Sequence, residues 1–321
     1  MIRKNLNLTL KQYYSDMVIE PNFLDEVEVL EKKKIFFGLL TRTLYELPDR
    51  YKIFGELDPI YIYEYRPIWS KVKKVVICAP ILGGEIEYKK GKYKGDFPIA
   101  KANAIACALF KRWTSIVVCT NNSKLFDDGK DPATFEMSIR NVAYNNIETL
   151  RWLELKYGKD ITIYGLGVSL GALTMGALHG IDDSIEKSVL ILGGGPLYTV
   201  ISNSKEGKVV KFYERMVALY NDRTKAEKAL KENIVTDPYI LGKIIPDNKT
   251  LLVIAQKDNS VPTTCQRNLI KVMRPKEVIS VNYPKWFKFF GRFNRDFSNG
   301  HYLTLILYPY LIYKTFKFFK D

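Results

Sequence analysis

One short stretch of the sequence combines a nucleophilic side chain with small neighbours. Residues 167–171 form a G-x-S-x-G pattern, between a strand-like run at 161–164 and a segment of helical character at 173–179. A strand–turn–helix of this kind holds its serine in an unfavourable backbone conformation, so that the hydroxyl projects clear of the sheet. The residues two before and two after it must be small because strand and helix converge there. The pattern predicts Ser169 as a nucleophile.

The sequence has two histidines, so the search for a general base is a choice between them. A serine nucleophile usually needs a base, most often histidine. His179 lies ten residues after Ser169 on the same expected helix, about 15 Å along its axis, and cannot reach the hydroxyl. It is better explained as a histidine on a helix face. His301, in a glycine-containing loop before the last apolar segment, is the predicted base.

A carboxylate is needed to orient the histidine and to stabilise its charged form. The continuous apolar run 251–255 has the pattern of a strand buried on both faces, and Asp258 is the acidic residue of the turn that follows it. Catalytic groups collect at this carboxyl edge of parallel sheets. Asp258 is the predicted acid, although an Asx turn or a helix cap before Pro262 would also explain it. Asp182 and Asp183 are weaker alternatives.

Two backbone donors are needed for the oxyanion of an acyl intermediate. The amide of Leu170, directly after the nucleophile, is the first predicted donor. The second should come from the loop after an earlier core strand. Residues 72–79 have the character of such a strand, and Pro80-Ile81-Leu82-Gly83-Gly84 follows it.

At this point the sequence, from about residue 60 to the end, resembles the α/β-hydrolase superfamily. The order Ser169, Asp258, His301 is the superfamily's order of nucleophile, acid and base. The loop at 80–84 looks like a variant of the superfamily's His-Gly-x-Gly-Gly loop, and the match implies Leu82 as the second oxyanion donor. Pro80 and Ile81 stand where the superfamily has His-Gly, which leaves the choice between Leu82 and Ile81 open. A plain Gly-Gly turn is the other explanation.

The remaining elements agree with this fold class. Strands are expected at 60–65, 115–119, 188–192 and 277–283, and helices near 97–112, 133–157, 262–272 and 302–319. Strands that alternate with helices imply an α/β protein with a mostly parallel central sheet covered by helices on both faces. Two further parts are expected: a helical N-terminal extension at 1–58, with 35–47 as one amphipathic stretch, and a helical cap insertion at about 197–248 within a hydrolase domain at 59–321.

Composition fits an enzyme of this kind. The chain has 321 residues, of which 47% are apolar, enough for a large core and one elaborated domain. The four cysteines are widely spaced without a C-x-x-C pattern, so buried free thiols are expected. We find neither a secretory signal nor a stretch long enough to span a membrane. A cytoplasmic protein is the simplest expectation.

Charge is the feature that a hydrolase site does not explain. The formal net charge is +14, and residues 271–321 hold ten Lys and Arg against three Asp and Glu. Basic and aromatic residues alternate in the segment 285–297, just before His301. Such a segment can bind an anionic membrane surface or single-stranded nucleic acid, or it can simply pack its aromatic rings inward. Of the two partners, the sequence favours the membrane.

Together these features predict a serine hydrolase with the α/β-hydrolase fold. The expected substrate is a small-molecule carboxylic ester or thioester, because neither reaction needs a metal or a cofactor. The predicted catalytic residues are Ser169, Asp258 and His301. An acyltransferase with the same three residues and a non-catalytic binding protein on the same scaffold are the alternatives. In the superfamily that the sequence resembles, such insertions shape the substrate pocket, so the cap is expected to determine which substrate is accepted.

Overall fold

A computed structural model describes residues 26–47, 59–69, 71–81, 87–89, 92–94, 97–110, 114–119, 125–282 and 300–320. Within them, nine strands form one sheet in the order β1-β2-β3-β7-β4-β8-β9-β10-β11, and a separate two-stranded sheet pairs β5 with β6. Pairing is antiparallel from β1 to β7 and parallel from β7 to β11. The strands are β1 (Glu28–Ile35), β2 (Leu40–Leu47), β3 (Ile60–Pro67), β4 (Lys74–Ala79), β5 (Glu87–Lys89), β6 (Lys92–Lys94), β7 (Thr114–Cys119), β8 (Thr162–Val168), β9 (Ile185–Ile191), β10 (Thr250–Ala255) and β11 (Glu277–Val281).

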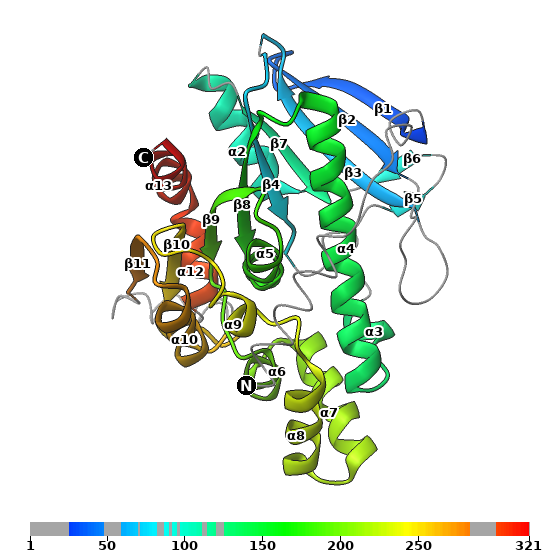
Figure 1. The fold of residues 1–321 in the computed structure, drawn as a ribbon, viewed down its shortest axis with the longest axis vertical. Coiled ribbons are helices and arrows are strands. Elements are labelled where there is room, and N and C mark those ends of the chain that lie inside the picture. Colours follow the sequence, from blue (N-terminus) through cyan, green and yellow to red (C-terminus); the bar gives the residue numbers. More distant parts are fainter. Residues whose placement is uncertain are drawn as a thin grey trace, which may run out of the picture.

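Helices cover both faces of the sheet, as predicted (Figure 1). One face carries α2 (Pro98–Leu109), α12 (Gly300–Ile306) and α13 (Tyr308–Lys320). The other face carries α4 (Pro132–Tyr157), α5 (Leu170–Ile181), α9 (Pro238–Leu241) and α10 (Thr263–Met273). Because both faces are covered, the central strands are mostly apolar, and every residue of β7 and β10 is buried.

The insertion between β9 and β10, referred to below as the cap, is helical. It contains α6 (Leu197–Asn203), α7 (Gly207–Tyr220), α8 (Arg223–Asn233) and the short α9. Helices α6, α7 and α8 share a small apolar core with α3 (Leu125–Asp128) and with the first turns of α4 and α5. Figure 1 shows α7 and α8 projecting beyond the end of the sheet at which β8 gives way to α5. The cap therefore stands over the carboxyl ends of the parallel strands.

The N-terminal part differs from the prediction. A helical extension was expected, with 35–47 as one amphipathic stretch, but β1 and β2 form an antiparallel hairpin that joins the main sheet through β3. Phe36 and Phe37, which both have positive φ angles, form the turn between β1 and β2. The error has a physical cause. Leu40 and Leu44 pack on one face of the sheet and Leu47 on the other, so the apolar spacing of a strand covered on both faces imitates the period of a helix.

Most other elements lie where the sequence places them. Strand β3 lies within two residues of its expected bounds and pairs antiparallel with β7, and β10 begins and ends within a residue of its predicted bounds. The single helix expected at 302–319 is divided into α12 and α13, with the break just before Pro309. All four cysteines are free and buried, as predicted. None of the helices in the described ranges combines the length and apolar character that crossing a bilayer requires.

Candidate active site

Ser169 occupies a strained turn between β8 and α5. Its φ of 56° and ψ of −121° lie in a region that residues other than glycine rarely adopt. Its N–H donates to the Ile191 carbonyl at 2.8 Å. The glycines on either side allow the close approach. A Cβ on Gly167 would collide with the Gly171 carbonyl oxygen, and a Cβ on Gly171 with that of Ala79. The turn thus has the geometry that the G-x-S-x-G pattern predicts.

Asp258 and His301 are in contact, as predicted, although 43 positions separate them in the sequence. The His301 Nδ1 atom lies 2.9 Å from Asp258 Oδ2, and both residues are buried. His301 is the second residue of α12. The residue before it, Gly300, determines how closely the start of α12 approaches the loop that carries Asp258. The Gly300 N–H donates to the Lys257 carbonyl at 3.2 Å, and a Cβ on Gly300 would collide with the Gln256 carbonyl oxygen. Glycine at position 300 therefore lets α12 begin against the loop that carries Asp258.

The Asp258 carboxylate accepts hydrogen bonds from three donors and also contacts His301. Oδ1 accepts from the backbone N–H groups of Ser260 and Val261 at 2.8 and 3.0 Å. Oδ2 accepts from Gln266 Nε2 at 2.8 Å as well as contacting His301. The side chain of Asp258 is fully buried. A buried carboxylate with this many hydrogen-bond partners is fixed in position, so it can orient the His301 ring.

Gln266 is a site residue that the sequence analysis missed. It belongs to α10 and is fully buried. Its Oε1 accepts from the Ala255 N–H at 2.8 Å, and its Nε2 also donates to the Val261 carbonyl at 2.7 Å. The signal in the sequence is a polar residue within the apolar stripe of an amphipathic helix, next to Cys265 and one turn before Leu269.

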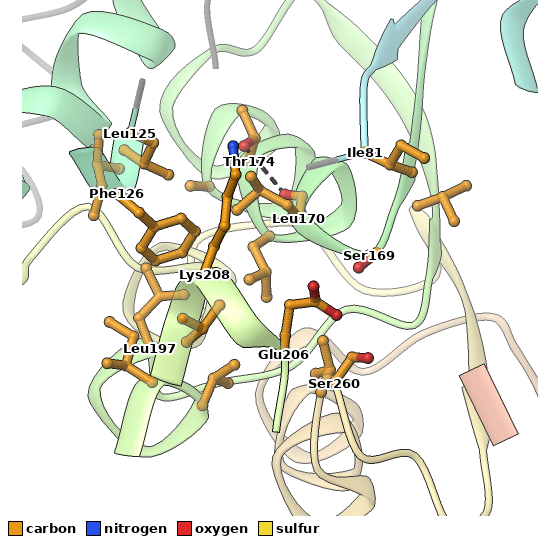
Figure 2. Close-up of a pocket in the computed structure, with 18 of the residues that line it drawn as sticks. Ile81, Leu125, Phe126, Ser169, Leu170, Thr174, Leu197, Glu206, Lys208 and Ser260 are labelled. Atoms are coloured by element: carbon orange, nitrogen blue, oxygen red, sulfur yellow. Dashed lines mark hydrogen bonds between the residues drawn. The ribbon is translucent and has the colours of Figure 1, made fainter. Parts of the chain in front are cut away.

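Ser169 and His301 line one cavity of about 330 Å³ between α5 and the cap. Figure 2 shows the Ser169 hydroxyl directed into this cavity, with Glu206 and Ser260 on the facing side. The structure thus brings together the three side chains predicted from the sequence: Ser169 and His301 at one cavity, and Asp258 in contact with His301.

Two backbone amides were predicted as oxyanion donors. Leu170 is the first residue of α5 and lines the cavity. The N–H groups in the first turn of a helix have no partner within the helix, so the Leu170 amide can donate to a ligand there. Ile81 also lines the cavity. Leu82 lies outside the residues that the structure describes.

The other sequence candidates have structural partners. His179 is buried in α5 with its Nδ1 atom 2.7 Å from Ser188 Oγ, and burial together with nearby Lys249 lowers its pKa to about 4. Asp182 accepts from the Arg151 guanidinium at 2.6 Å. Neither lines the cavity. In the part of the chain that the structure describes, no group of three His, Cys, Asp or Glu side chains is placed to hold a metal ion.

Comparison with known proteins identifies the fold. No protein-family model matches the sequence, and no curated protein matches it either. The structure is similar to acetyl xylan esterase 1 from Thermoanaerobacterium sp. JW/SL YS485 (TM-score 0.59, 12% identity, 90% of this chain and 92% of that one). It is also similar to the acetyl xylan esterase from Paenibacillus sp. R4 (0.60, 11%, 91% and 92%) and to the glucuronoyl esterase from Solibacter usitatus (0.50, 10%, 92% and 92%). With the sheet order and the strained turn at Ser169, these likenesses show that the chain has the α/β-hydrolase fold.

Proposed function

We propose that this chain is a serine hydrolase that cleaves a carboxylic ester or thioester through an acyl-enzyme. One observation carries the proposal: Ser169, on its strained turn, shares a cavity with His301, whose Nδ1 atom contacts the buried Asp258 carboxylate. The three structurally similar proteins are named as esterases, which supports this class of reaction.

In the proposed mechanism Ser169 Oγ attacks the acyl carbon while His301 Nε2 takes its proton. Asp258 accepts the Nδ1–H hydrogen bond, which fixes the tautomer of the ring and stabilises the imidazolium. The carbonyl electron pair moves to oxygen, and the oxyanion accepts hydrogen bonds from the Leu170 amide and from that of Ile81 or Leu82.

Collapse of this intermediate breaks the bond to the alcohol or thiol, which leaves with the proton from His301. Water then attacks the acyl-enzyme as His301 removes its proton. The second collapse releases the carboxylic acid and returns the proton to Ser169. The ester or thioester and one water are consumed, and the cycle needs no oxidant or reductant.

The experiment is labelling of the purified chain with a fluorophosphonate, together with turnover of p-nitrophenyl butyrate. Ser169→Ala should abolish labelling and lower kcat by at least about a thousandfold, because the residual catalysis in such sites comes only from binding and the oxyanion donors. Ser202→Ala, on α6 and outside the cavity lining, is the matched control and should retain both. Near-native turnover by folded Ser169→Ala would refute the assignment of the nucleophile.

A further inference from the structure

The cavity beside Ser169 has an apolar interior. One face of α5 forms a wall through Leu170, Leu173 and Ala177, whose spacing places them on one side of the helix. Ala177 lies eight positions after Ser169, which corresponds to roughly 12 Å along the helix axis. The cavity therefore follows the helix well beyond the nucleophile. Apolar side chains from α3, α4 and the cap complete the wall, among them Leu125, Phe126, Phe135, Leu197 and Val209.

Aromatic rings support the far part of this cavity. Phe126 and Phe135 both line it and are stacked, with ring centroids 5.5 Å apart. Phe212 packs behind Phe135 at 4.5 Å and is itself buried. Rings packed at these distances have little freedom to move aside, so they set a defined limit to the depth of the cavity.

The charged groups of the lining belong to one short segment. Among the described lining residues, Glu206 and Lys208 are the fully charged ones, and both lie at the start of α7. Lys208 is exposed and Glu206 half-buried, whereas the apolar wall at Leu173 and Phe135 is buried. Figure 2 shows both charged side chains extending from the cap among the residues that line the cavity. The charges therefore mark its mouth.

The two threonine hydroxyls of the lining already donate to protein acceptors. The Thr174 hydroxyl donates to the Leu170 carbonyl at 3.2 Å, and the Thr236 hydroxyl donates to Glu136 at 2.7 Å. A hydroxylated or charged acyl group would lose its hydrogen bonds to water without gaining equivalent ones from these side chains, which is unfavourable. An apolar chain has no such cost, and its burial is favourable.

We infer that this cavity is an acyl-chain site, and that the preferred substrates are esters or thioesters of medium-length apolar carboxylic acids with the alcohol or thiol at the charged mouth. This inference rests on the proposed function. Size supports it as well as polarity. The cavity volume of about 330 Å³ is far larger than the roughly 30 Å³ that one water occupies in the liquid. An acetyl group is small, so it would leave most of this volume to water. The cavity thus selects on the acyl side, and the Phe126–Phe135 pair limits the chain length.

The test is a chain-length profile of kcat/KM with p-nitrophenyl acetate, butyrate, hexanoate, octanoate and dodecanoate. Each added methylene should raise kcat/KM by roughly fourfold until the chain reaches the aromatic rings, which is the factor that burial of one methylene gives. The profile should then fall for dodecanoate. Equal values for acetate, hexanoate and octanoate, with fluorophosphonate labelling intact, would overturn the inference and leave the proposed function standing.

Two variants should move the profile in opposite directions. Ala177→Leu fills the wall of α5 and should shift the preferred chain length downwards, lowering the octanoate-to-acetate ratio by roughly tenfold or more. Phe126→Ala removes a limiting ring and should shift it upwards, towards dodecanoate. Leu219→Ala, an exposed position of α7 outside the lining, is the matched control and should keep the wild-type ratio. Unchanged ratios in both cavity variants would contradict the inference.

A binding measurement separates the inference from the proposed function. Octanamide, a neutral compound without an ester, should bind to wild type and to Ser169→Ala alike in a calorimetric titration, and more weakly to Ala177→Leu. Binding without turnover or labelling would refute the hydrolase and support the acyl-chain site. Turnover without chain-length preference and without octanamide binding would support the hydrolase and refute the acyl-chain site.

Discussion

Gln266 connects three parts of the site through a single amide group. It holds Asp258 Oδ2, the Val261 carbonyl and the Ala255 N–H, all within 2.8 Å. Gln266→Leu keeps the size of the side chain but removes these hydrogen bonds. Because a hydrogen bond to a charged group is worth about 1.5–3 kcal/mol, we expect kcat to fall by roughly ten- to a hundredfold, with KM little changed.

A control separates positioning of Asp258 from general destabilisation. Asn268→Ala lies on the same helix and removes a hydrogen bond to the Gly195 carbonyl, outside the cavity lining. It should lose stability without the same loss in kcat. If Gln266→Leu and Asn268→Ala lowered kcat equally at matched folded fraction, Gln266 would have only a structural role.

His179 gives a stability prediction with a defined pH window. Burial, with a contribution from Lys249, lowers its folded-state pKa from 6.5 to about 4. Between these values the unfolded chain binds more protons than the folded chain. The contribution of neutral His179 to the free energy of unfolding is therefore fully present above pH 6.5 and decreases as the pH falls towards 4. The full contribution is roughly 3 kcal/mol.

His179→Gln does not titrate and should lack this part of the acid destabilisation. Denaturant unfolding of both proteins at pH 7.5, 5.5 and 4.5 measures the difference. The variant should also hydrolyse p-nitrophenyl butyrate at near the wild-type rate at pH 7.5, since His179 is outside the cavity. A folded but inactive His179→Gln would contradict the choice of His301 as the base.

At the scale of elements, one buried carboxylate joins the two ends of the cap. Asp237 accepts from the Leu197 N–H at 2.7 Å, where α6 begins, and from the Tyr239 N–H at 2.8 Å, where α9 begins. Asp237→Ala would leave both donors buried without this partner. We expect a loss of about 2–3 kcal/mol in the free energy of unfolding and a lower kcat, because cap residues line the cavity.

The matched control is Asp222→Ala, which removes the exposed N-cap of α8 at the tip of the cap. Loss of such a cap costs about 1 kcal/mol, and here it should leave the cavity intact. Denaturant unfolding and p-nitrophenyl butyrate kinetics compare the two variants. Equal effects on kcat would show that Asp237 is not a specific anchor of the cap.

The elements also show how far the sequence predicts this structure. The parallel strands were predictable because runs such as 251–255 are apolar throughout, and the turn at Ser169 was predictable because its glycines are required by a close approach. The β1–β2 hairpin was not, since burial on both faces imitates a helical period. Gln266 was missed because its role depends on contacts between α10 and the Asp258 loop, which spacing along the chain does not reveal.

At the scale of the whole molecule, the formal charge of +14 should govern its encounters with anionic surfaces. The segment 285–297 holds Lys285, Lys288, Arg292 and Arg295 against Asp296, interspersed with aromatic residues. It lies outside the residues that the structure describes, so the expectation comes from its composition and from its position immediately before α12 and His301. The segment ends four positions before the proposed base, His301, so a partner bound to it would be held near that residue in the sequence.

We predict that the protein binds vesicles containing anionic lipid and releases them as salt is raised, since each Lys or Arg near such a surface contributes about 1 kcal/mol and salt screens it. Reversal of Lys285, Lys288 and Arg292 to Glu should abolish co-sedimentation with anionic vesicles at low salt. Reversal of Lys211, Lys225 and Lys228, exposed on α7 and α8, changes the net charge equally and should retain most of it. Equal loss in both variants would assign the attachment to overall charge. Equal recovery of wild type with neutral and anionic vesicles would refute the prediction of binding to anionic lipid.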